Sequence, residues 1–229
     1  MNKKLALLAT PALILAASAA TANHGWGVMP YVGADAEWRH MNFQNGFGDN
    51  LFRHDYPQGN LYAGLKFNDY VAVEAGYEAT ARKTRAVTLG AGSLSGGAVL
   101  PLNVQFHSTG QIKGPHANLV GFLPLCDQYR LELIGMVGVA RLKANFVRTA
   151  VASNGTAISP SYTTFIKRKS VLRLGGGIQQ MITECWGIRA MLKWENTKKL
   201  DRMGAIENSL ASLRPKNSFI YSLGTFLTF

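Results

Sequence analysis

The chain has 229 residues, of which 47% are hydrophobic and 16% charged, and 24 Lys and Arg against 13 Asp and Glu give a formal net charge of +11. Soluble domains usually carry about 25% charged residues, so the composition argues against an ordinary water-exposed enzyme. The apolar fraction also argues against a disordered chain. The length suits one domain, or two.

The first predicted element is a secretory signal peptide. Lys3 and Lys4 precede an apolar run over residues 5–17, and small residues follow up to Ala22. The run is shorter than the ~20 residues that a transmembrane helix needs, and it contains Pro11. We therefore expect residues 1–22 to be cleaved off and residues 23–229 to form the mature protein.

The rest of the chain is organised with period two. No apolar stretch of 18 or more residues follows residue 22, which excludes a helical membrane protein. Segments with an apolar residue at every second position instead cover residues 32–38, 61–67, 71–78, 118–125, 129–134, 172–179, 188–195 and 218–229. Long polar or Gly-rich connections, alternating with short turns, cover residues 42–57, 84–116, 148–170 and 197–217.

This alternation of short and long connections predicts an all-β fold, an eight-stranded antiparallel up-and-down transmembrane β-barrel. The long connections would then be extracellular. A weak alternation at Val104 and Phe106 predicts a hairpin that rises past the membrane within 84–116, and it leaves a ten-stranded barrel open. A soluble β-barrel or sandwich is the alternative for the whole pattern.

The positions between these apolar residues carry charges of both signs, and several glycines that would make room for long side chains. Buried charges in a narrow lumen must be compensated, which favours a membrane barrel over a solvated sheet. We expect a lumen charge network made of Asp35, Glu37, Arg39, Lys66, Glu74, Glu78, Arg130, Glu132, Arg173, Arg189, Lys193 and Glu195.

The two cysteines, Cys126 and Cys185, fall in two of the short turns. An up-and-down barrel places these turns side by side on the periplasmic rim. A disulfide between them and two free thiols both stay open, because a bridge requires Cα atoms within ~7 Å.

Residues 59–78 (GNLYAGLKFNDYVAVEAGYE) resemble the second and third strands of the outer membrane protein A (OmpA) family, and residues 172–183 and 187–196 resemble its sixth and seventh strands. The chain ends in GTFLTF, where Gly224, Leu227 and Phe229 are placed like the C-terminal signal that the barrel-assembly machinery recognises. The resemblance implies the transmembrane domain of that family, in the outer membrane of a Gram-negative bacterium.

The same resemblance bears on the lumen and on the chain's extent. Glu74 falls on the family's interior Glu of the third strand, whereas Gln179 and Met191 stand where the family usually has Glu and Arg. The family's own gate is therefore not expected. Because the chain stops at the last barrel strand, the peptidoglycan-binding domain that follows in OmpA is not expected either.

Catalytic, cofactor and metal sites are not expected. His107 next to Ser108 is a candidate hydrolytic pair, and Asp49, His54 and Asp55 could form an Asp/His site, but solvated loop residues explain both sets. The cysteines stand alone, and the histidines lack the spacing of metal ligands.

Basic residues gather at the outer rim, where lipopolysaccharide phosphates are a more accessible anion than nucleic acid. They are Arg82, Lys83, Arg85, Lys113, Arg141, Lys143, Arg148, Lys167, Arg168, Lys169, Lys198, Lys199, Arg202, Arg214 and Lys216. We thus expect a structural or surface-interaction barrel with a plugged or narrow polar lumen that contacts outer-membrane lipid and lipopolysaccharide, and a host or surface ligand through its loops. A narrow ion-conducting pore and an outer-membrane lipid-modifying enzyme are the alternatives.

Overall fold

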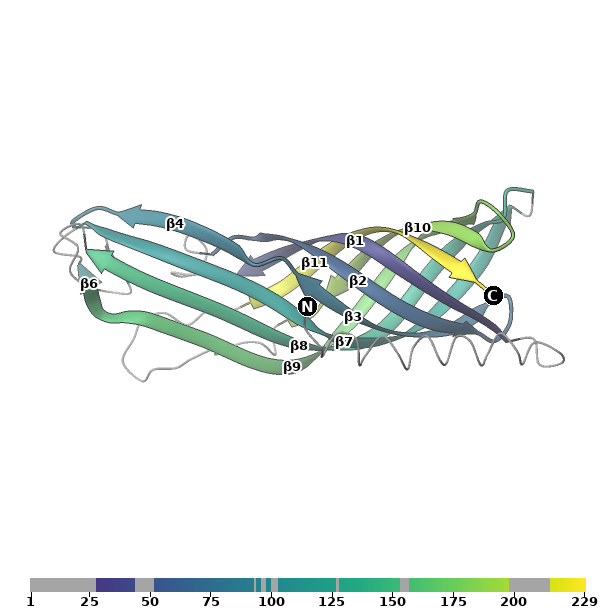
Figure 1. The fold of residues 1–229 in the computed structure, drawn as a ribbon, viewed down its shortest axis with the longest axis horizontal. Helices are drawn as coiled ribbons and strands as arrows, with labels where there is room; N and C mark the ends of the chain where they lie inside the picture. Colours follow the sequence, from purple (N-terminus) through teal and green to yellow (C-terminus); the bar gives the residue numbers. More distant parts are fainter. Residues whose placement is uncertain are drawn as a thin grey trace, which may run out of the picture.

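The computed structural model describes residues 28–43, 52–92, 94–95, 98–99, 103–126, 128–152, 157–197 and 215–229. Eight strands form a closed antiparallel ring, in which β3 pairs with β7 and β11 pairs with β1 (Figure 1). They are β1 (Met29–Phe43), β2 (Asp55–Lys66), β3 (Val71–Thr80), β7 (Val104–Cys126), β8 (Leu131–Ala152), β9 (Ala157–Met181), β10 (Trp186–Glu195) and β11 (Pro215–Thr228). The predicted eight-stranded barrel is confirmed.

Three further strands lie outside the ring, so among the described residues the barrel does not have ten strands. They are β4 (Lys83–Leu89), β5 (Leu94–Ser95) and β6 (Ala98–Val99). β4 pairs with β7, with Leu89 opposite Val104, and this pair is the hairpin expected to rise past the membrane. β5 and β6 pair only with each other.

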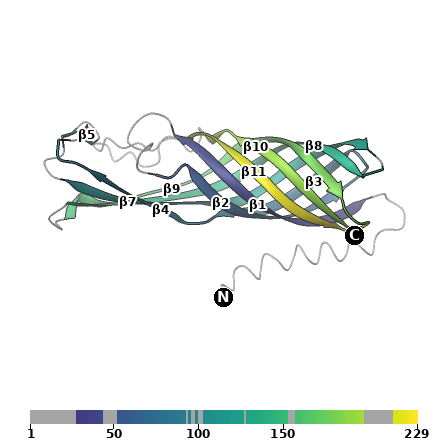
Figure 2. The same cartoon turned by 90° about the horizontal axis from the view of Figure 1, so that it is seen from above.

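The strands are strongly staggered around the ring. The row of paired residues that starts at Leu65 on β2 passes through β3, β7, β8, β9, β10, β11 and β1, and it returns to β2 at Asp55, ten residues from its start. A closed barrel with such a stagger has its strands tilted by roughly 35–45° to its axis. Figure 2 shows this tilt, with β1 and β11 side by side.

Three neighbouring strands are much longer than the others. β7, β8 and β9 have 23, 22 and 25 residues, whereas β3 and β10 have 10 each. Together with β4 they form a four-stranded sheet that projects beyond one end of the barrel (Figure 1). At about 3.4 Å per residue, the part of β8 beyond Ala140 extends on the order of 40 Å. We call this part of β4, β7, β8 and β9 the projecting sheet.

The projecting sheet changes the predicted connections. Strands run through much of 84–116 and 148–170, which were expected to be long connections. Apart from the hairpin expected from Val104 and Phe106, the sequence pattern missed these strands because it required apolar residues at the outward positions. The outward positions of this sheet are polar, for example Gln105, Thr109 and Gln111. β2 and β11 also begin inside 42–57 and 197–217, at Asp55 and Pro215.

In the barrel itself, successive residues alternate between an apolar outer surface and a filled lumen. On β2, for example, Leu61 and Leu65 are exposed on the outer surface, whereas Asn60 and Tyr62 are buried. Among the described residues, no helix is long and apolar enough to cross a membrane.

Candidate functional site

The lumen holds a layer of charged side chains that come from four strands, β1, β3, β9 and β10. Glycines and other small residues make room for them, and Gly224 on β11 is the clearest case. A Cβ atom there would meet the carboxylate of Asp35 on the paired strand β1. At this position, the glycine therefore leaves the space that a lumen carboxylate occupies, as expected from the sequence.

Four of the predicted residues form a closed ring of ion pairs, which we call the outer ring. Arg39 on β1 and Arg173 on β9 each contact both Glu78 on β3 and Glu195 on β10. The Arg39–Glu78 distance is 2.5 Å and the Arg173–Glu78 distance is 2.7 Å. All four side chains are at most 1% exposed, and their charges balance. Burial of four charges is tolerated only when each is paired in this way.

Five more predicted residues form a second group, the inner group, with two cations and three carboxylates. Arg189 contacts Asp35 at 3.1 Å and Glu74 at 2.5 Å, and Lys193 contacts Asp35 and Glu37. The inner group therefore has one carboxylate more than its cations neutralise.

Uncharged polar side chains complete the inner group and connect it to the outer ring. Tyr31 donates a hydrogen bond to Glu74 at 2.9 Å, and Asn60 donates one to Asp35 at 3.2 Å. Gln58 connects the two sets, because it accepts from Arg39 and donates to Glu37. These partners were not singled out from the sequence, because only charges were sought on this parity.

His116 falls within the connection expected over residues 84–116, but the structure places it in a strand. It is buried in the lumen on β7, where its Nε2 lies 2.8 Å from the Asn60 side-chain oxygen and its Nδ1 lies 3.2 Å from the Asn118 amide nitrogen. These contacts fit a neutral imidazole that donates from Nε2 and accepts at Nδ1. It was misplaced because residues 84–116 were expected to be a connection.

Apolar clusters lie on both sides of the charged layer. Toward the end where β1 begins and β11 ends, the lumen is filled by Tyr31, Tyr62, Ala72, Val120, Phe122, Ile134, Met136, Met191 and Phe226. Toward the projecting sheet, a second cluster starts in the lumen and continues along the inner face of that sheet. It consists of Met41, Phe52, Tyr56, Val104, Phe106, Ile112, Ala140, Leu142, Ala144, Phe146 and Val171. Members of the second cluster such as Tyr56 and Phe146 are at most 1% exposed. The charges are therefore enclosed between two apolar layers.

The remaining three predicted lumen residues lie at the opposite end from the projecting sheet. Lys66 and Glu132 form a separate pair at 3.0 Å, with side chains 15% and 18% exposed, and Gln179 donates to Glu132. Arg130 is not in the lumen. It is exposed in the turn before β8 with φ of 47°, and its placement in the network was wrong because a turn residue does not continue the alternation of the strand.

The two cysteines are free in the structure. Cys126 ends β7 opposite Leu131 on β8, whereas the backbone oxygen of Cys185 accepts a hydrogen bond from Thr228 of β11 at 2.8 Å. The turn that contains Cys185 is thus bonded to β11, on the side of the β9–β10 hairpin away from β8. Of the two alternatives, the structure has the two free thiols and not the disulfide.

The candidate hydrolytic residues do not come together. His107 is exposed on the outward face of β7, and Ser108 is buried on the opposite face, so the two cannot act as a pair. Asp49 lies outside the described residues. Asp55 instead contacts His40 at 2.8 Å, and the ring of His40 stacks on that of His54. Within the described part of the chain, no group of three or more His, Cys, Asp or Glu is placed to hold a metal ion.

The basic residues of the outer rim divide between the two faces of the projecting sheet. Arg85 donates to the backbone oxygen of Phe52, and Arg148 lies over the ring of Phe106, both on the inner side. The outward side carries Lys113, Arg141, Lys143 and Arg168. Lys198, Lys199, Arg202, Arg214 and the side chain of Lys167 lie outside the described part.

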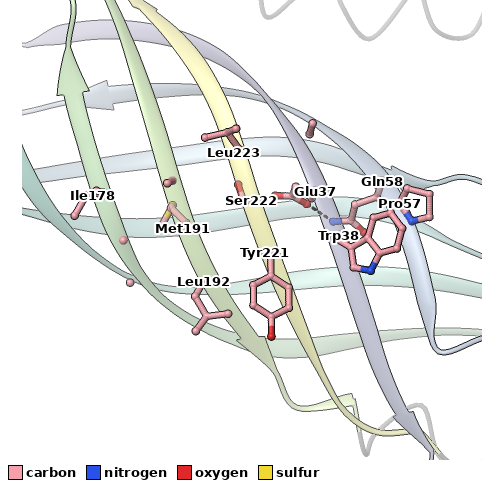
Figure 3. A pocket seen from close by; sticks show the side chains of 14 residues that line it. Glu37, Trp38, Pro57, Gln58, Ile178, Met191, Leu192, Tyr221, Ser222 and Leu223 are labelled. Carbon is pink, nitrogen blue, oxygen red and sulfur yellow. Dashed lines mark hydrogen bonds between the residues drawn. The ribbon is translucent and has the colours of Figure 1, made fainter.

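The outer wall of the barrel has a shallow hollow of about 670 Å³ across β9, β10, β11, β1 and β2. Figure 3 shows Trp38, Leu192, Tyr221 and Leu223 around it, each on the outward face of its strand. Small outward residues such as Ala190 form its floor. Glu37 and Gln58, whose hydrogen bond is drawn in Figure 3, belong to the lumen side of the same wall.

A closed eight-stranded ring with an apolar outer surface and an interior of paired charges defines a transmembrane β-barrel. The chain belongs to the family described as outer membrane protein beta-barrel domain, whose sequence model matches residues 5–210. Membership places the protein in the outer membrane of a Gram-negative bacterium, and the projecting sheet then lies at the end of the barrel opposite the short turns. The resemblance to the OmpA-like barrels is confirmed at this level.

Solved structures that are similar to this chain include three bacterial proteins. Neisserial surface protein A is 14% identical with a TM-score of 0.50, over 87% of this chain and 97% of that one. The Yersinia pestis attachment invasion locus protein Ail is 14% identical with a TM-score of 0.45, over 88% and 97%. OprG from Pseudomonas aeruginosa is 11% identical with a TM-score of 0.46, over 90% and 97%. No curated protein matches the chain by sequence.

Proposed function

We propose that this protein is a closed surface barrel: a non-conducting, non-enzymatic outer-membrane anchor that presents the projecting sheet outside the cell. The observation that carries the proposal is the filled lumen. An apolar cluster lies on each side of the charged layer, and an eight-stranded barrel is just wide enough for its own side chains to fill.

The charged layer supports a closed lumen by its pairing. An ion that crosses the barrel would have to separate the outer ring, in which both arginines and both glutamates already have partners. Breaking a buried ion pair costs several kcal/mol unless another charge replaces the lost partner. A second barrier follows from the apolar clusters, because an ion entering either one loses its hydration.

The projecting sheet supports the surface role. Three barrel strands continue as a sheet on the order of 40 Å beyond the ring, a length that barrel closure does not require. Its contacts are proposed to be with lipopolysaccharide near the membrane, and with a host or surface ligand farther out. Loops and strand ends on the outer side of barrels commonly carry such binding functions.

The targeting steps belong to the same proposal. Residues 1–22, which lie outside the described part of the structure, would be cleaved as a signal peptide. Gly224, Leu227 and Phe229 would then guide the mature chain to the barrel-assembly machinery. Leu227 and Phe229 are 44% and 50% exposed on β11 and just after it.

Conductance of the refolded mature chain in a planar bilayer tests the proposal, after a heat-modifiable gel shift has shown that the barrel is closed. We expect the shift without steady conductance. As a control for opening, Arg39→Ala with Arg173→Ala removes both cations of the outer ring, and we expect it to increase leak currents. Steady wild-type conductance would contradict the proposal and favour the narrow pore.

A further inference from the structure

Four basic side chains form a compact cluster on the outward face of the projecting sheet, at its base. Lys113 on β7 is paired with Lys143 on β8, and Lys143 is paired with Arg168 on β9. Arg141 lies two residues from Lys143 on the same face of β8. Directly opposed residues have Cβ atoms about 4.5–5.5 Å apart, so the row of three spans roughly 10 Å. We call these four residues the basic cluster.

The protein does not neutralise the basic cluster within its described part. Like charges in directly opposed positions destabilise a sheet, and none of the four cations is in a salt bridge with a described carboxylate. The next outward positions along β7 and β9 toward the barrel are uncharged, namely Pro115 and Ser170. An anion from outside would therefore remove an unfavourable interaction.

The position of the basic cluster indicates where that anion comes from. Two residues farther toward the barrel, the outward row consists of Ala117, Val139 and Leu172, and the row after that of Leu119, Val137 and Leu174. The cluster is thus the first charged part of this outer wall beyond the apolar band. Lys and Arg side chains at such a boundary lie along apolar surface and direct their charge to the lipid headgroups.

The face above the cluster argues against a long soluble polyanion. Gln111 and Asn145 form the next outward row, and Thr84, Thr109 and Val147 form the row after it. The described residues of β7 and β8 in these rows are uncharged, and the cation beside them is the exposed Arg82, which precedes Lys83 of β4. A polyanion that ran along β7 and β8 would therefore leave the basic cluster after one row. The phosphates of a lipid headgroup at the membrane surface would lie at the level of the cluster itself.

We infer that the basic cluster binds the phosphate groups of an outer-leaflet lipid, the lipid A portion of lipopolysaccharide, while the acyl chains of that lipid lie on the apolar rows below. Arginine can form two parallel hydrogen bonds with one phosphate, so Arg141 and Arg168 are suited to fix the headgroup and the two lysines to add charge. This inference rests on the proposed function only for the orientation, with the projecting sheet outside the cell.

The test measures lipid retained by the refolded mature chain in vesicles of phosphatidylcholine with either lipid A or dephosphorylated lipid A. Retention is counted by native mass spectrometry after transfer to detergent. The variant K143Q/R168Q is compared with R53Q/R130Q, which removes the same charge at two exposed positions outside the basic cluster. The gel shift verifies that every variant is folded.

We expect the wild type and R53Q/R130Q to retain lipid A well above its dephosphorylated form. K143Q/R168Q should retain about thirtyfold less lipid A, which corresponds to roughly 1 kcal/mol for each cation at an anionic surface. Equal retention of the two lipids, or equal losses in the two variants, would overturn the inference.

A second arm adds heparin as a soluble sulfated competitor in lipid-free detergent. Binding of heparin that depends on Lys143 and Arg168 as strongly as lipid A binding does would assign the cluster to a soluble polyanion and overturn the lipid assignment. The lipid-binding inference and the proposed closed lumen can fail separately. Steady conductance would refute the closed lumen but would leave lipid retention unchanged.

Discussion

Glu195→Gln tests whether the outer ring stabilises the barrel. Glu195 is fully buried, contacts both Arg39 and Arg173, and accepts a hydrogen bond from Ser218 at 3.0 Å. The amide keeps the shape but removes the charge, so that two buried arginines share Glu78 alone. Removal of one partner from a buried ion pair costs about 3–5 kcal/mol.

Urea unfolding of the protein refolded in lipid vesicles measures this cost, followed by tryptophan fluorescence and by the gel shift. With a denaturant slope of about 3 kcal/mol per molar urea, the midpoint should fall by roughly 1–1.7 M. The matched control is Glu132→Gln, because Glu132 pairs with Lys66 where both side chains are partly exposed. Exposed pairs contribute about 0–1 kcal/mol, so its midpoint should fall by about 0.3 M or less.

The double variant Arg173→Gln with Glu195→Gln removes one charge of each sign and leaves Arg39 paired with Glu78. We expect it to be more stable than the sum of the two single losses predicts, because residues in one network are coupled by about 0.5–3 kcal/mol. If Glu195→Gln lowers the midpoint no more than Glu132→Gln does, the outer ring does not stabilise the barrel and the reasoning from buried pairing fails.

Three further results are expected. Gly224→Ala should reduce the folded fraction in the gel-shift assay, because the added Cβ would meet a lumen carboxylate. The control Gly59→Ala should fold normally, since nothing lies within 4 Å of the added Cβ. Equal folding of the two variants would contradict the role of the lumen glycine. Phe229→Ser should lower the amount of folded barrel in cells but not the yield of refolding in detergent, because the side chain is half exposed and is proposed to act as an assembly signal. An equal loss in both assays would assign it a packing role. The hydrogen bond from His40 lowers the pKa of the Asp55 carboxyl below its usual 3.8, so the ionised carboxylate stabilises the fold above that pH and the stabilisation is lost as the pH falls through the lowered pKa. Asp55→Asn should therefore lower the free energy of unfolding at pH 7 by less than about 1 kcal/mol, as expected for an exposed pair, and should not lower it at pH 2. A loss that is the same at both pH values would exclude the ionic contribution.

The barrel strands could be predicted because lipid imposes a simple pattern on them. Between Val32 and Trp38, apolar residues face the membrane at every second position, and the charged residues between them have to face the lumen. Nine of the twelve predicted lumen residues lie in the outer ring and the inner group for this reason. The pairing within each set depends on the register and tilt of the strands, which one sequence does not contain.

The same pattern fails where the surrounding solvent changes from lipid to water. Above the membrane the outward positions become polar, so the outer parts of β8 and β9 were expected to be connections. For residues 84–116 only a hairpin was expected, from Val104 and Phe106, and His116 was placed in the connection. The inward parity there is still apolar, at Val104, Phe106, Ile112 and Phe146. A search for apolar residues at every second position, on whichever face they lie, would have predicted the projecting sheet.

The projecting sheet also bears on the thermodynamics of recognition. A flexible surface loop loses backbone entropy of about 1–2 kcal/mol per residue when a partner orders it. Strands that continue from a closed barrel and pack on a buried apolar cluster are already ordered before any partner arrives. A ligand of this sheet would gain the contact energy with little entropic penalty for ordering the protein. We therefore expect its affinity to depend on the side chains of one rigid face and not on the ordering of loops.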